Sequence, residues 1–95
     1  MAKAIPIAGL SDGVLSASTS VQRLMGWSVG ESDGTPAVAS FLLKQGGASG
    51  KVVAVVELAA NGSNNAWFGP NGVVIDGDLY FDIVGGTVQG SVYVA

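Results

Sequence analysis

Turn-forming residues divide this chain into short intervals, and this spacing is the strongest constraint on its fold. Clusters of glycine, proline, asparagine, aspartate and serine interrupt the sequence repeatedly, and such clusters mark turns and loops. They fall at residues 11–13, 30–36, 46–50, 61–65, 70–72, 76–77 and 85–86. Most of the intervals between them have the length of a β-strand.

The composition favours an all-β fold. Valine, glycine, serine and alanine dominate, whereas the helix-favouring residues glutamate, lysine, arginine and glutamine are scarce. A chain of 95 residues forms one domain with one modest core. We expect about seven short strands in a sandwich or barrel. The candidates span residues 5–10, 21–29, 37–44, 51–58, 73–75, 79–84 and 87–94.

The last two candidate strands show the alternation of a sheet with one buried face. In the final one, Val88, Val92 and Val94 share a face with Gly90, while Gln89, Ser91 and Tyr93 share the other. In the strand before it, every second residue from Leu79 is strongly apolar. The alternation predicts that the valines of the final strand enter the core.

The stretch KVVAVVEL, residues 51–58, is apolar on both faces. The pattern predicts Val53 and Val55 on one face and Val52, Ala54 and Val56 on the other. A strand of this kind is either central and covered on both sides or has an outer face that meets another chain. We interpret it as the central strand of the fold and expect Val55→Asp to be strongly destabilising.

The segment SVQRLMGWSVG, residues 20–30, is compatible with a helix or a strand. The spacing of Val21, Leu24 and Met25 suits a helix, but Gly26, Trp27 and Val29 favour a strand that contains a bulge. We predict the strand, with Trp27 in the core.

Side chains for the commonest enzymatic chemistry are missing. The chain has no histidine and no cysteine, which excludes Ser-His-Asp and Cys-His catalysis and the usual zinc and transition-metal sites. No lysine lies in a recognisable motif with a serine. We therefore expect no enzymatic activity, no cofactor and no metal.

Two motifs invite a functional interpretation but are better explained by turns. Asp76, Asp78 and Asp82 form the densest carboxylate cluster, yet Asp-Gly between apolar runs predicts a hairpin that joins residues 73–75 to residues 79–83. The stretch KQGGASGK lacks the spacing of a phosphate-binding loop, and we predict a second hairpin there.

The pair Trp67-Phe68 precedes a Pro-Asn-Gly turn. Adjacent residues of a strand point to opposite faces, so one ring is expected in the core and the other at the surface or an interface. Three interpretations remain open: both rings pack under the turn, one forms a protein contact, or one provides a platform for a sugar.

The charge of the chain limits its partners. Only 12% of the residues are charged and the net charge is −3, and no basic cluster is present to neutralise phosphates. We expect neither nucleic acid nor an anionic membrane surface as a partner.

The N-terminal segment, MAKAIPIAGLSDG, does not have the pattern of a signal peptide, because Pro6 and Gly9 interrupt its apolar stretch. We expect residues 1–20 to be an N-terminal arm or edge segment that offers Ile5 and Ile7 to a partner, and residues 21–95 to be the β-sandwich domain.

Four stretches together resemble a known group of proteins. LMGWSVGE, GKVVAVVEL, FGPNGVVIDGDLYFDIVGG and GSVYV are similar to the strands and turns of small all-β virion structural proteins of tailed bacteriophages. The resemblance covers residues 21–95. It departs at Asp78, where the group commonly has glycine.

The resemblance implies a jelly-roll-like or related β-sandwich of seven to eight short antiparallel strands, made in the host cytoplasm. It further implies a decoration (cement) protein on the outer capsid surface, which binds the major capsid protein and stabilises the shell without chemistry. Symmetric closure at the local threefold axes of a shell suggests a homotrimer. The candidate interface comprises Trp67, Phe68, Tyr80, Ile5 and Ile7. The alternative is a small carbohydrate-binding module that uses Trp67, Phe68 and Tyr80.

Overall fold

The computed structural model describes residues 3–8 and 12–95, and within them every regular element is a β-strand. All strand pairs are antiparallel. The strands are β1 (Lys3–Pro6), β2 (Gly13–Ser16), β3 (Val21–Glu31), β4 (Ala39–Gln45), β5 (Lys51–Leu58), β6 (Ser63–Trp67), β7 (Val73–Asp76), β8 (Leu79–Gly85) and β9 (Val88–Val94). The predicted all-β class is confirmed, with nine strands instead of seven to eight. Over this part of the chain, no helix is long and apolar enough to cross a membrane.

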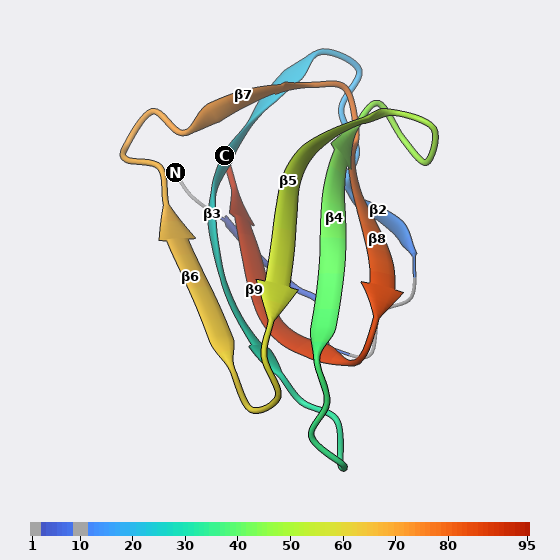
Figure 1. Ribbon diagram of the computed structural model, residues 1–95. Helices are drawn as coiled ribbons and strands as arrows, with labels where there is room; N and C mark the ends of the chain where they lie inside the picture. The colour runs from blue at the N-terminus through green and yellow to red at the C-terminus, as the bar shows by residue number, and fades with distance from the viewer. Residues whose placement is uncertain (1–2, 9–11) are drawn as a thin grey trace.

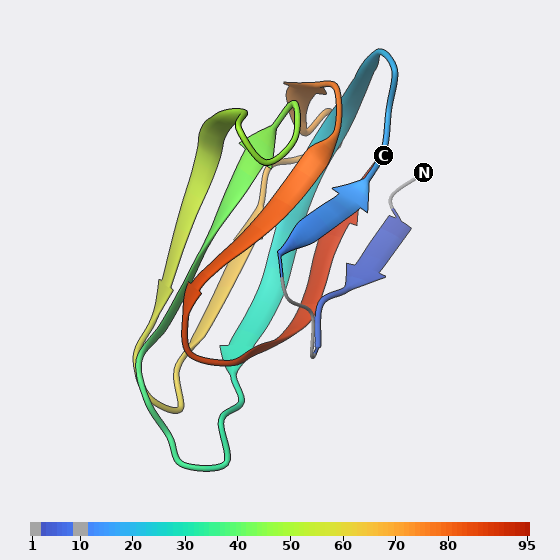
Figure 2. The same cartoon turned by 90° about the vertical axis from the view of Figure 1, so that its right-hand side faces the viewer.

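The strands form two sheets that pack face to face (Figures 1 and 2). Sheet A has the order β1-β9-β3-β6, and β7 pairs with the other end of β3. Sheet B has the order β2-β8-β4-β5. Since β6 and β7 pair with successive parts of β3 in the same direction, they act as one interrupted strand. Counted in this way, the two sheets have the strand order of a jelly roll.

The core lies between the sheets and follows the alternation expected from the sequence. Val88, Val92 and Val94 are buried from sheet A, and Leu79 and Phe81 are buried from sheet B. The rings of Phe41 and Phe81 lie 5.1 Å apart at the centre of this layer. The predicted inward faces of the last two strands are therefore confirmed.

Strand β3 is a central strand of sheet A, because it pairs with β9 on one side and with β6 and β7 on the other. The register against β9 shifts between Leu24 and Gly26, which is the bulge that the sequence predicted. Gly26 has a φ of 151°, and a Cβ atom there would lie 2.1 Å from the carbonyl oxygen of Ala66. Only glycine allows the two backbones to approach so closely. The strand prediction for this segment, with a buried Trp27, is confirmed.

The prediction that residues 51–58 form a central strand is wrong. β5 pairs only with β4 and is an edge strand of sheet B. Val56 is completely buried, whereas Val55 is 61% exposed. A register shift between Leu43 and Lys44 also places Val52 opposite Lys44 on the outer face, away from Ala54 and Val56. The strand is apolar on both sides, but the side chains on its outer side are exposed to solvent.

The predicted hairpin at Asp76-Gly77 is wrong in its pairing, although its backbone conformation is right. Gly77 has a positive φ of 85°, as the turn was expected to require. However, β7 belongs to sheet A and β8 to sheet B, so the turn carries the chain from one sheet to the other. The second predicted hairpin is confirmed, because β4 and β5 pair directly across the glycine-rich loop.

Two strands were not predicted, and a third has different bounds. β2 has four residues, and β6 has the polar sequence SNNAW. The first candidate strand, residues 5–10, is observed as β1 at Lys3–Pro6, and its residues 9–10 lie outside the described part of the chain. β1 and β2 are edge strands of the two sheets.

Candidate functional site

Trp67 and Phe68 point in different directions, as the sequence predicted. The Trp67 side chain is 61% exposed on the outer face of sheet A. The Phe68 ring instead packs edge-on against Trp27, with ring centroids 5.4 Å apart. Trp27 is only 8% exposed, and its indole Nε1 donates a hydrogen bond of 2.9 Å to Asn64 Oδ1. Phe68 is 38% exposed, so its ring covers Trp27 at the edge of the core without being buried in it as predicted, and Trp67 remains available to a ligand or partner.

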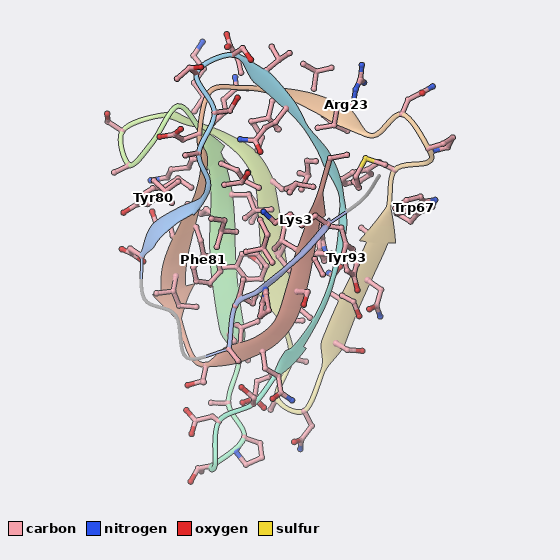
Figure 3. All side chains as sticks on the ribbon, turned by 180° about the vertical axis from the view of Figure 1, so that it is seen from behind. Lys3, Arg23, Trp67, Tyr80, Phe81 and Tyr93 are labelled. Atoms are coloured by element: carbon pink, nitrogen blue, oxygen red, sulfur yellow. The ribbon has the colours of Figure 1, made fainter. Side chains whose placement is uncertain are left out.

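The other three candidate residues do not join Trp67 on one surface. Tyr80 lies opposite Lys44 on the outer face of sheet B, and Figure 3 shows it on the far edge of the molecule from Trp67. Ile7 is 1% exposed, and Ile5 packs against the same core. Consequently neither isoleucine is free for a partner, and Trp67, Phe68 and Tyr80 cannot act together as one sugar platform.

The outer face of sheet B is rich in exposed apolar side chains. Val55 lies opposite the half-buried Leu42, which in turn lies opposite Asp82. Further exposed valines are Val52 on the same strand, Val14 on β2 and Val84 on β8. We call this outer face of sheet B the valine face; it carries Val14, Leu42, Val52, Val55 and Val84, with Tyr80, Lys44 and Asp82 among them. The valine face was not predicted as a site, because its members are far apart in sequence and only the strand order brings them together.

One ion pair crosses the valine face. Lys44 Nζ lies 2.7 Å from Asp82 Oδ2, and the two side chains are about four-fifths buried. The same ammonium group donates to the carbonyl oxygen of Ala48. Two of the few charges of this sheet thus neutralise each other within it, which lowers the polarity of the face further.

The outer face of sheet A is more varied. Its strands β6 and β9 carry serine and asparagine side chains together with the rings of Trp67 and Tyr93, and Val21 and Val74 are exposed where β3 pairs with β7. Ser28 Oγ donates a hydrogen bond of 2.6 Å to Asn65 Oδ1 on the neighbouring strand. Figure 3 views the molecule from this side and shows Tyr93 and Trp67 on neighbouring parts of the sheet. Tyr93 was predicted to face outward, but nothing in the sequence indicated that it lies in the same row as Trp67.

Asp78, Asp82 and Glu31 hold parts of the fold together. Asp78 Oδ1 accepts a hydrogen bond from the backbone nitrogen of Ser18, and Asp82 forms the ion pair described above. Glu31, which is buried, accepts backbone hydrogen bonds from Asp33 and Asn61 and so joins two loops. Within the described residues no three metal-binding side chains come together.

One depression of the structure has a volume of about 440 Å³. It lies at the end of β4 and β5 and is lined by Val38, Ser40, Glu57, Leu58 and Gly85, among others. Glu57 is its only ionisable side chain. A single carboxylate provides no acid and base pair, so the depression offers no catalytic arrangement of its own.

Comparison of the chain with protein-family models, with curated proteins and with solved structures gives no match. The function must therefore be inferred from the surfaces themselves.

Proposed function

We propose that this protein is a non-enzymatic structural component that binds a larger protein assembly through the valine face. The observation that carries the proposal is the exposure of Val55 and its apolar neighbours on the outer face of sheet B. Exposed apolar side chains that cluster on one face mark sites of protein contact, and here Val55 and the half-buried Leu42 lie directly opposite each other. The neutralised ion pair of Lys44 and Asp82 lowers the cost of removing this face from water.

The assembly we propose is the shell of a tailed bacteriophage, to which the protein binds from outside as a decoration (cement) protein. Two features support this proposal. The sequence resembles small virion structural proteins over residues 21–95, and the jelly roll is a fold that recurs in viral capsid domains. Because one fold serves many functions, the second feature alone would be weak support. In this proposal the major capsid protein is the partner, and a homotrimer is the symmetric form that suits a threefold axis of the shell.

The expected effect of binding is a more stable particle. Each copy that binds the assembled shell and not the released subunit shifts the equilibrium toward the shell. The experiment compares particles with and without the protein while they are heated and genome release is followed. We expect release at a lower temperature from particles that lack it. Equal release temperatures would contradict the proposed role.

A pair of variants tests whether the valine face makes the contact. Val55→Asp places a charge on the valine face, and Ser63→Asp places the same charge on the outer face of sheet A, where Ser63 is exposed. We expect Val55→Asp to lose binding to stripped particles in a co-sedimentation assay, since burying an unpaired charge is costly. Ser63→Asp should bind as the wild type does. Equal binding by both variants would exclude the valine face.

A further inference from the structure

Trp67 and Tyr93 lie on either side of Gly26. The register of sheet A places Gly26 opposite Trp67 on β6 and opposite Tyr93 on β9. Residues directly opposite each other on neighbouring strands point to the same face of the sheet. The two rings therefore rise from the same outer face, with their Cα atoms separated by two strand spacings, or about 10 Å.

Gly26 lies between the two rings and is itself buried. It has no side chain, and the bulge geometry prevents any larger residue there because a Cβ atom would meet the Ala66 backbone. In the next row of the sheet, Ser28 lies opposite Asn65 on one side and Ser91 on the other. The result is a strip of the outer face with an aromatic ring on each side of Gly26 and small polar side chains in the next row.

The polar groups of this strip are neutral and partly ordered. The hydrogen bond from Ser28 Oγ to Asn65 Oδ1 fixes the amide and leaves its nitrogen to donate to a ligand. The outward-facing positions of β6 and β9 are Ser63, Asn65, Trp67, Gln89, Ser91 and Tyr93. None of these six side chains carries a charge at neutral pH.

The nearest charge on the same face of β3 is Arg23, beyond the bulge. Its Nη1 donates a hydrogen bond of 2.7 Å to the carbonyl oxygen of Asn71, so the guanidinium is already engaged by the loop before β7. A nucleic acid needs several free cations to neutralise its phosphates, and this face does not offer them. An uncharged ligand fits the strip better than an anionic one.

We propose that this strip binds a neutral polysaccharide chain, with pyranose rings stacked on Trp67 and Tyr93. The C–H face of a pyranose is apolar and weakly positive, and it matches the negative face of an aromatic ring. The hydroxyl groups at the sugar's edge then find donors and acceptors in Asn65, Ser28 and Ser91. This second surface faces away from the valine face, and the inference does not depend on the proposed capsid role.

The experiment measures binding of four neutral hexasaccharides, cellohexaose, mannohexaose, xylohexaose and chitohexaose, by isothermal titration calorimetry. We expect saturable binding of at least one. Trp67→Ala and Tyr93→Ala should each weaken it by about tenfold or more, the scale of one lost stacking contact. Tyr80→Ala removes a tyrosine from the other sheet and serves as the matched control, so its affinity should equal that of the wild type.

Trp67→Phe provides a second test in which the aromatic stack is conserved. It should retain most of the affinity that Trp67→Ala loses, and circular dichroism should show that both variants are folded. Absence of binding by all four sugars at millimolar concentration would overturn the inference. It would equally be overturned by binding that survives the loss of both Trp67 and Tyr93, or by a loss of affinity in Tyr80→Ala as large as in those variants.

Discussion

The outer faces of the two sheets differ more than their inner faces do. Both sheets bury valine and leucine against each other. Outside, one carries the valine face, whereas the other carries serine, asparagine and two aromatic rings along β6 and β9, with exposed valines where β3 pairs with β7. A two-layer fold needs apolar residues only on the sides that meet. The difference outside is therefore not required by folding, and it indicates that the two surfaces have different partners.

The two tryptophans give the largest expected contrast between the inside and outside of sheet A. Trp27→Ala removes a buried ring, its contact with Phe68 and its hydrogen bond to Asn64, and it should cost about 3–5 kcal/mol of unfolding free energy. Trp67→Ala, at an exposed position, should cost less than about 1 kcal/mol.

Urea denaturation of both variants measures this contrast. Comparable losses would mean that Trp67 supports the core and is not a free surface ring. Fluorescence adds an independent check, because the protein has only these two tryptophans. Emission from the Trp67→Ala variant should come from a buried indole alone.

Two neighbouring valines of β5 give the corresponding contrast for sheet B. Val56→Ala should cost about 2 kcal/mol, since the side chain is completely buried. Val55→Ala should change stability by less than about 0.5 kcal/mol in the isolated protein. Thermal or urea denaturation at low protein concentration tests the pair. If Val55→Ala proved as costly as Val56→Ala, the valine face would already be covered in solution, which a concentration series would reveal as self-association.

These valines also show where sequence reasoning reached its limit. The alternation in residues 51–58 correctly separated Val55 from Val56, because side-chain period is a local property of a strand. Whether the strand is central or at an edge depends on which distant segments pair with it. The same sequence suits both positions when the outer face is apolar, so the central placement was wrong.

The two missed strands have a related cause. In β6, Ser63 and Asn65 face outward, and Asn64 on the other side holds the Trp27 indole. Asparagine is rare in strands, so this segment, whose asparagines form a hydrogen bond to the core and part of a polar surface, was interpreted as a loop.

The turn at Gly77 was predicted from its residues. Whether such a turn closes a hairpin or connects two sheets depends on β3, β4 and β2, which pair with the flanking strands and lie elsewhere in the sequence.

The candidate site was predicted in part. Opposite directions for Trp67 and Phe68, and an outward Tyr93, followed from alternation alone. The row of Trp67, Gly26 and Tyr93 did not, because it requires the register of three strands and the position of one bulge. Local patterns thus predicted which face of its own strand a side chain occupies. Which side chains of different strands share a face could be determined only from the strand order of the structure.

The smallest expected effect concerns the ion pair of the valine face. Lys44→Met should destabilise the protein by about 0.5–1 kcal/mol at low salt, because Asp82 keeps its charge without a partner. Lys51→Met is the control, since Lys51 is exposed and forms no ion pair among the described residues. The double variant Lys44→Met with Asp82→Leu should regain the lost stability, because no unpaired charge remains. It should also self-associate more strongly in sedimentation equilibrium, since the apolar area of the valine face becomes larger. A double variant that stays monomeric at every concentration tested would show that a larger apolar area does not make this face self-associate. The proposal that the valine face is a protein-binding surface, distinct from the outer face of sheet A, would then lose its main support.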